Sequence, residues 1–324
     1  LLAHNLSMQQ LHQRQRSFRA HPMARPSELE SVFLSRLPFS LTAAQERVCG
    51  EIHDDMARGH PMQRLVQGDV GSGKTVVAAV AALRAIGCGF QVALMAPTEL
   101  LAEQHLRSFA SWLSPLGIEP VWLSSKVTGR KRQAALDAIA KGSPLAIGTH
   151  ALMQQGVNFA QLGLAVVDEQ HRFGVHQRLA LMDKAGGETT HAHQLVMTAT
   201  PIPRTLAMTA YAGLDTSVID ELPPGRKPVT TVVISAARRR QVIERVEAAC
   251  REGRQAYWVC TLIEESDAVQ AQAAEDVARD LRGSLHGVEV GLVHGRMIPA
   301  EKQEIMDRVK NGGIGRLVAT TVIG

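Results

Sequence analysis

Short runs of aliphatic residues alternate with longer amphipathic segments along most of this chain, after a polar start at residues 1–36 that is rich in Gln, His and Arg. Such runs predict strands of a parallel sheet buried on both faces, and the segments between them predict helices that cover the sheet. In the first part of the chain we expect strands at 64–67, 91–96, 121–123, 145–148, 164–168 and 194–197, and helices at 74–86, 99–113 and 130–141. This alternation is typical of an α/β fold.

A stretch dense in Pro and Gly at residues 222–228 interrupts the pattern and predicts a linker between two lobes. Beyond it we expect strands at 229–234, 255–260, 288–293 and 316–320, and helices at 238–251, 268–281 and 300–309. The expected organisation is an N-terminal helix and linker (1–36), a first lobe (37–222) and a second lobe (223–324). The second lobe has fewer strands than a doubly wound sheet usually has, and the chain begins with Leu, so we expect a piece of a longer protein.

The composition indicates which structural class of protein the chain belongs to, but it does not decide the function. Hydrophobic residues make up 45% of the 324 residues and charged residues 20%, which excludes a disordered chain. The net charge of +4 permits a nucleic-acid partner but does not predict one. The four cysteines are far apart, so reduced thiols in a cytoplasm are expected rather than a zinc site or disulfides. Neither a membrane-spanning run nor a secretory signal is visible, and no membrane partner is expected.

Residues 68–75 read Gly-Asp-Val-Gly-Ser-Gly-Lys-Thr, a complete G-x-x-x-x-G-K-[ST] motif between an expected strand and an expected helix. The glycines let successive backbone N–H groups surround a phosphate, and the helix N-terminus adds its dipole. We expect Lys74 to reach the β- and γ-phosphates and the Thr75 hydroxyl to ligate Mg²⁺. The residues predicted to bind the nucleotide here are Gly68, Asp69, Val70, Gly71, Ser72, Gly73, Lys74 and Thr75.

Two adjacent carboxylates, Asp168 and Glu169, follow a later aliphatic run. Like charges at a strand end repel each other, and a bound cation removes that repulsion. We therefore expect Asp168 to hold Mg²⁺ through its water shell and Glu169 to orient and deprotonate the attacking water. Together with Lys74, these residues form the predicted catalytic group. Taken alone, such a pair of carboxylates is more often a solvated turn, and the phosphate loop favours the catalytic interpretation.

Further short motifs, in order along the chain, resemble those of superfamily 2 helicases and translocases. The segment 168–171 reads Asp-Glu-Gln-His, a box of DExH type, and 198–200 reads Thr-Ala-Thr, similar to the motif that couples the nucleotide state to domain motion. The resemblance implies coupling roles for His171, Thr198 and Thr200. A packed core histidine is the alternative for His171.

Three upstream segments extend this resemblance. Residues 96–100 and 148–150 resemble the motifs that touch the nucleic-acid backbone, which implies DNA contacts at Thr98, Thr149 and His150. For the two threonines, helix capping is an equal alternative. Residues 37–45 resemble the adenine-reading Q motif, which implies that Phe39 and Gln45 bind ATP; a Gln amide can donate and accept at once, as the adenine edge requires.

The finer resemblance is to the RecG family of bacterial branched-DNA translocases and covers nearly the whole chain. It rests on residues 168–178, 198–206 and 221–226 in the first lobe and on 257–266 and 294–297 in the second. It implies two RecA-like, doubly wound lobes, the second incomplete, in an ATP-hydrolysing DNA helicase of recombination and repair that uses Mg²⁺. The implied partner is branched double-stranded DNA, such as stalled forks and Holliday junctions, with single-stranded-DNA-binding protein as a further partner. A bacterial, cytoplasmic monomer is expected.

Two alternatives stay open at this point. A transcription-repair coupling translocase shares the duplex-translocase layout, but its box fits the sequence less well. A truncated, non-catalytic module that binds DNA in a nucleotide-dependent manner is the third hypothesis, because the family carries an arginine finger beyond the segment that ends this chain. That finger neutralises transition-state charge, so we expect the chain to bind Mg-ATP and to turn it over slowly.

Overall fold

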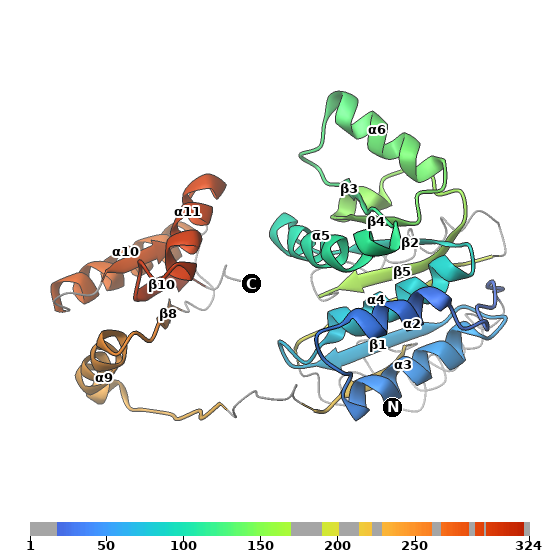
Figure 1. The fold of residues 1–324 in the computed structure, drawn as a ribbon. Helices are drawn as coiled ribbons and strands as arrows, with labels where there is room; N and C mark the ends of the chain where they lie inside the picture. The colour runs from blue at the N-terminus through green and yellow to red at the C-terminus, as the bar shows by residue number, and fades with distance from the viewer. Residues whose placement is uncertain are drawn as a thin grey trace, which may run out of the picture. The chain divides into compact units, whose positions relative to one another are not determined.

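The computed structural model describes residues 18–169, 190–200, 214–221, 229–260, 267–284, 289–294 and 296–320. The chain forms two compact units, Leu1–Lys227 and Pro228–Gly324 (Figure 1). Each unit contains a parallel sheet with helices packed beside it, so the expected α/β class is confirmed. Among the described residues, no helix combines the length and the apolar character that crossing a membrane requires.

The first unit is built on a seven-stranded, fully parallel sheet with the strand order β3-β4-β2-β5-β6-β1-β7. Its strands are β1 (Gln63–Gly68), β2 (Gln91–Met95), β3 (Val121–Leu123), β4 (Leu145–Gly148), β5 (Leu162–Asp168), β6 (His193–Thr198) and β7 (Asp215–Ile219). Six of these match the expected aliphatic runs to within two residues, while β7 was not expected. Its alternating exposed and buried positions lack a continuous apolar run, as suits a strand at the edge of a sheet.

The helices of this unit connect and cover the strands. They are α2 (Glu28–Arg36), α3 (Ala43–Met56), α4 (Lys74–Gly87), α5 (Glu99–Leu113) and α6 (Gly129–Ala140), with short 3₁₀ turns η1 (Ser114–Leu116) and η2 (His150–Met153). The central helix α4 is buried along almost its whole length, and both α2 and α3 pack against it (Figure 1). A helix that is apolar all round belongs inside a fold, which explains its Ala- and Val-rich sequence.

Two hydrophobic cores lie on opposite faces of this sheet. Alternate residues of the central strands point to opposite faces, so Val92 and Leu94 join one core while Ala93 and Met95 join the other. The first core includes side chains of α2 to α5, and the second includes side chains of α6 and η2. Burial on both faces fixes the register of the sheet and therefore the positions at which its strands end.

The N-terminal segment of the first unit includes a helix that was not expected, α2. Ser27 caps it, with its hydroxyl accepting from the N–H of Leu29 and its own N–H donating to the Glu30 carboxylate. Phe33 on this helix is only 2% exposed and belongs to the first core. The capping box was present in the sequence as Ser27-Glu28-Leu29-Glu30, but the prolines nearby favoured a linker there.

The second unit contains a three-stranded parallel sheet with the order β8-β10-β9. Its strands are β8 (Ala256–Cys260), β9 (Val290–Val293) and β10 (Arg316–Thr320). The helices are α9 (Arg239–Arg251), α10 (Asp267–Ser284) and α11 (Pro299–Lys310), preceded by the 3₁₀ turn η5 (Ala236–Arg238). These elements match the expected ones closely, and α10 packs on the sheet through Ala274, Ala278 and Leu281.

The prediction of a strand at residues 229–234 is wrong. These residues form no strand in the structure, and their apolar side chains are exposed, with Val229 at 83% and Val232 at 70% of full exposure. Val and Thr fit a pleated, half-buried surface, but this preference needs a neighbouring strand to pair with. The described sheet of the second unit provides no pairing for this segment.

Candidate functional site

The carboxyl ends of three neighbouring strands, β1, β6 and β5, bring the main candidate residues together. The strand β1 leads into the phosphate loop, β5 ends at Asp168 and β6 ends at Thr198. Because the strands are parallel and adjacent, all three ends lie on one edge of the sheet, which is where ligands bind in open α/β folds.

The phosphate loop is packed tightly against the residue predicted to read adenine. Gly73, the residue before α4, has φ +90°, and a Cβ placed there would lie 2.2 Å from Gln45 Nε2. The same Nε2 donates to the carbonyl oxygen of Ser72 at 2.8 Å. The Ser72 hydroxyl is buried and has no hydrogen-bond partner among the described residues. Glycine is therefore required at Gly73 by both conformation and space.

Lys74 lies at the start of α4, with its ammonium group folded onto the loop. Nζ donates to the carbonyl oxygens of Gly68 at 2.6 Å and Asp69 at 3.0 Å. Burial lowers the pKa of Lys74, and the nearby carboxylates of Asp168, Glu169 and Asp69 act in the opposite direction. The lysine thus lies within electrostatic range of both carboxylates at the end of β5, and these carboxylates favour its charged form.

Asp168 is buried, and both of its carboxylate oxygens have partners. Oδ1 accepts from the N–H of Glu169 at 3.1 Å, and Oδ2 lies 2.6 Å from His105 Nε2. An ionised carboxylate has no proton to give, so the imidazole donates from Nε2. His105 lies on α5 and was not predicted as a site residue. The sequence signal that could have identified it is the presence of this polar residue in the otherwise apolar stripe of Ala102, Phe109 and Leu113.

Glu169 has a left-handed backbone, with φ +47°. Its carboxylate accepts from the N–H of Ala199 at 2.9 Å and from the Thr198 hydroxyl at 3.3 Å. The Thr198 hydroxyl in turn accepts from the N–H of Thr200 at 3.2 Å. The second acidic residue of the box is therefore joined to the segment 198–200, although nearly thirty residues separate them in sequence.

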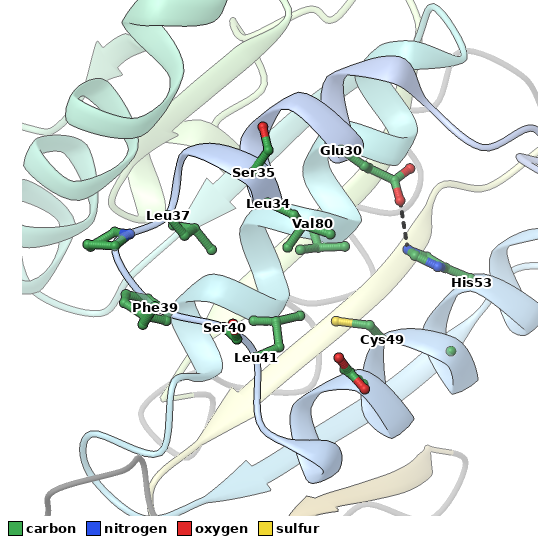
Figure 2. A pocket seen from close by; sticks show the side chains of 13 residues that line it. Glu30, Leu34, Ser35, Leu37, Phe39, Ser40, Leu41, Cys49, His53 and Val80 are labelled. Carbon is green, nitrogen blue, oxygen red and sulfur yellow. Dashed lines mark ion pairs between the residues drawn. The ribbon is translucent and has the colours of Figure 1, made fainter.

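Residues 37–45, which are expected to bind adenine, border a pocket in the first unit. Gln45 forms a capping box with Thr42, and the neighbouring N–H of Ala44 donates to Glu221 Oε2 at 3.0 Å. Glu221 was not predicted as a site residue. Phe39 is 47% exposed and lies at the rim of a pocket of about 750 Å³ between α2, α3 and α4 (Figure 2).

This pocket has an apolar side and a charged side. Figure 2 shows Leu34, Leu37 and Leu41 on the first side and the contact between His53 Nε2 and the Glu30 carboxylate, at 3.4 Å, on the second. Burial, and then the Arg84 guanidinium, lower the pKa of His53, while Glu30 acts against them. Burial also raises the pKa of the nearby Cys49 thiol to about 12, so this cysteine is a poor nucleophile.

The predicted DNA contacts lie on the same sheet edge, at the ends of the adjacent strands β4 and β2. Thr98 follows β2, and its hydroxyl accepts from the N–H of Leu101, so the capping geometry is present. Thr149 follows β4 and is buried, with a hydroxyl that has no partner within the described ranges. His150 beside it is exposed. The predicted coupling residue His171 lies outside the described residues.

The donor set suits Mg²⁺ bound together with a nucleotide. In the part of the chain that the structure describes, no cluster of three His, Cys, Asp or Glu side chains could hold a metal by itself. Mg²⁺ typically keeps several waters and binds one or two carboxylates together with phosphate oxygens. Asp168 at the strand end and the hydroxyl residue Thr75 at the start of α4 match that requirement.

Similarity to known proteins extends over the whole length of the chain. A relative described as "ATP-dependent DNA helicase RecG" from Escherichia coli K12 is 61% identical over 325 residues, and one of the same description from Haemophilus influenzae is 58% identical. The alignments cover 100% of this chain and 47% of each relative, so the chain spans about half the length of these curated proteins.

Structural and family comparisons agree with this. A solved structure described as RecG bound to a three-way DNA junction matches with a TM-score of 0.78 at 38% identity, over 98% of this chain and 41% of that one. The family model described as "DEAD/DEAH box helicase" matches residues 42–209, which contain the phosphate loop, the acidic box and the segment 198–200. The chain belongs to the DEAD/DEAH box helicase family.

Proposed function

We propose that this chain is the motor region of an ATP-dependent translocase that acts on branched double-stranded DNA, as a RecG-type helicase. The observation that carries the proposal is the shared sheet edge. The phosphate loop and the residues Asp168 and Glu169 lie at the ends of β1 and β5, and the neighbouring ends of β2 and β4 carry Thr98 and Thr149. The identity to RecG relatives over the whole chain supports the same function.

In this proposal the loop residues 68–75 bind the phosphates of ATP through backbone N–H groups and the N-terminus of α4. Lys74 leaves the carbonyl oxygens of Gly68 and Asp69 and turns to the β- and γ-phosphates. Thr75 and Asp168 hold Mg²⁺, which supplies charge neutralisation at the phosphates when it is bound. Glu169 orients the attacking water and accepts its proton. Gln45 and Phe39 bind the adenine base.

Coupling between ATP and DNA runs through the edge of the sheet. The carboxylate of Glu169 is hydrogen-bonded to residues 198–200, so a change at the γ-phosphate changes the surroundings of that segment. His171 is proposed to act in the same coupling. Thr98, Thr149 and His150 contact the DNA backbone, which positions the protein on a duplex without reading its sequence. The proposal includes a monomeric protein of the bacterial cytoplasm, with single-stranded-DNA-binding protein as a further partner.

The test is ATP turnover by the chain with no DNA, with linear duplex and with a three-way junction, alongside binding of a fluorescent ATP analogue. A RecG-type motor binds the nucleotide with Mg²⁺, and its turnover rises most with the junction. Lys74→Ala is the control variant and is expected to weaken nucleotide binding. Turnover that is raised equally by linear duplex and by the junction contradicts the branched-DNA preference, and nucleotide binding by Lys74→Ala with the parental affinity contradicts the assignment of the loop.

A further inference from the structure

His105 connects the helix that follows the DNA-contact segment to the acidic box. It lies on the buried face of α5 with Ala102, Phe109 and Leu113, and its side chain is 9% exposed. Nε2 lies 2.6 Å from Asp168 Oδ2, a short separation of the kind that charge-assisted hydrogen bonds favour. A histidine in this stripe could have been a simple core residue, but its ring faces the one carboxylate that the proposed function assigns to Mg²⁺.

The hydrogen bond restricts a side chain that is otherwise free to turn. The terminal torsion of Asp is broad, so a carboxylate plane at the end of a strand has no strong preference of its own. Here one oxygen of Asp168 accepts from the N–H of Glu169 and the other from His105. Each oxygen keeps a further acceptor site, because an ionised carboxylate offers about four lone-pair positions. The carboxylate is therefore oriented and still able to accept hydrogen bonds from metal-bound water.

We propose that His105 is a positioning residue that orients Asp168 for the Mg²⁺ bound with ATP. The inference rests on the proposed function, because it assumes that Asp168 holds this ion. Groups that hydrogen-bond to metal-binding side chains typically change metal affinity by about 10- to 100-fold when they are removed. His105 makes no contact with nucleotide in this proposal and acts only through Asp168.

The residue that orients the Asp168 carboxylate lies on the helix that follows a predicted DNA contact. Thr98, the residue that caps α5, lies seven residues before His105, or about two turns, so both lie on the same side of the helix. A rigid helix moves as one body, and a displacement of its first turn reaches the hydrogen bond to Asp168. The residue predicted to contact DNA and the residue that orients the metal-binding carboxylate therefore belong to one element.

The experiment measures how Mg²⁺ changes nucleotide binding, using the fluorescent analogue mant-ATP and the chain as it exists. The variant His105→Leu fills the space and removes the donor, while His105→Gln keeps an N–H donor near the position of Nε2. We expect His105→Leu to raise the Mg²⁺ concentration at half-saturation by about 10-fold or more, and His105→Gln to stay within about twofold of the parent. Binding in EDTA should be the same for all three proteins.

A matched control separates this role from a structural one. His193 is another fully buried histidine, whose Nδ1 accepts from the N–H of Met62 and whose Nε2 donates to the His21 carbonyl. It lies opposite Leu164, at the other end of the strand pair from Asp168. We expect His193→Ala to lower the thermal midpoint of unfolding and to leave the Mg²⁺ dependence of nucleotide binding unchanged.

The outcomes distinguish this inference from the proposed function. If His105→Leu lowers stability but binds mant-ATP with the parental Mg²⁺ dependence, the positioning role is wrong while the proposed function stands. If Lys74→Ala binds mant-ATP like the parent, the proposed function itself fails. Should His105→Leu not fold, His105→Asn replaces it, because its shorter side chain carries a donor that does not reach the Oδ2 of Asp168. The same rise in the Mg²⁺ concentration at half-saturation is expected.

Discussion

The carboxylate of Glu169 accepts a hydrogen bond from the backbone N–H of Ala199 at 2.9 Å, which links the acidic box to the segment 198–200. The link crosses from β5 to the neighbouring strand β6, whose last residue, Thr198, also donates to this carboxylate. If Glu169 acts as the base in the proposed function, its movement toward a water at the γ-phosphate would loosen its hydrogen bonds with Thr198 and Ala199. In that proposal these hydrogen bonds are the route by which hydrolysis affects the segment 198–200.

Glu169→Gln is expected to keep nucleotide binding and lose hydrolysis. The amide oxygen can still accept from the N–H of Ala199, so the local structure is retained, but the amide cannot accept the proton of the attacking water. General base catalysis contributes about 100- to 10,000-fold, and we expect turnover to fall by at least about 100-fold. Turnover is measured as phosphate release with junction DNA, and mant-ATP binding serves as the control. Hydrolysis at the parental rate would show that another group is the base.

The parts of the site that lie close together in sequence could be predicted, because their chemistry depends on spacing. The phosphate loop needs its glycines, Lys74 and Thr75 in one continuous segment. Asp168 and Glu169 follow a short run of β-branched and other apolar residues that predicts a buried strand. The same holds for most of the fold. Strands buried on both faces produce continuous apolar runs, and their helices produce amphipathic ones.

The parts that were missed depend on contacts between distant segments. His105 and Asp168 are 63 residues apart in sequence, and Ala44 and Glu221 are 177 apart. Ala44 and Glu221 leave no local pattern. The polar His105 in an apolar stripe is a local signal, but it does not indicate which distant residue the imidazole faces. The strand expected at 229–234 failed for the same reason, because pairing depends on a partner that the local sequence does not specify.

Gly73→Ala is expected to weaken ATP binding by about 10-fold or more, beyond its effect on stability. An alanine at φ +90° costs about 1 kcal/mol of backbone strain. Its Cβ would in addition collide with Gln45 Nε2, which displaces the side chain that supports Ser72. The matched control is Gly142→Ala, at φ +95° with no atom within 4 Å of the new Cβ. Both should lower the free energy of unfolding, and equal mant-ATP affinities would contradict the argument.

Arg84→Met is expected to destabilise the first unit by about 3 kcal/mol, as removal of one partner from a buried ion pair does. Arg84 is 8% exposed and its partner Glu30 is 6% exposed. Arg84 also contacts His53 Nδ1 at 3.1 Å. The variant therefore leaves the buried Glu30 carboxylate without its guanidinium partner. Urea unfolding followed by tryptophan fluorescence gives the free energy. Arg107→Ala, which breaks an exposed ion pair with Glu103, is the control and should change it by less than about 0.5 kcal/mol. A loss as small as the control's would exclude a structural role for the buried pair.

Stability of the first unit should fall as the pH drops below about 6.5, the ordinary pKa of histidine. Burial lowers the pKa of His193, so over the range between its folded and unfolded pKa values the unfolded chain binds a proton that the folded chain does not. The free energy of unfolding therefore rises with pH in that range, by at most about 1.4 kcal/mol per pH unit for one histidine, and falls as the pH falls.

The structural cause is the hydrogen bond in which His193 Nδ1 accepts from the N–H of Met62 at 3.0 Å, because a protonated ring has no acceptor there. His193→Asn keeps an acceptor near that position and removes the titrating group. Urea unfolding between pH 8 and pH 5 should give a shallower decline for this variant than for the parent, even if its stability at pH 8 is lower. Parallel curves for the two proteins would assign the acid sensitivity to other groups, such as His53, whose pKa is also lowered by burial.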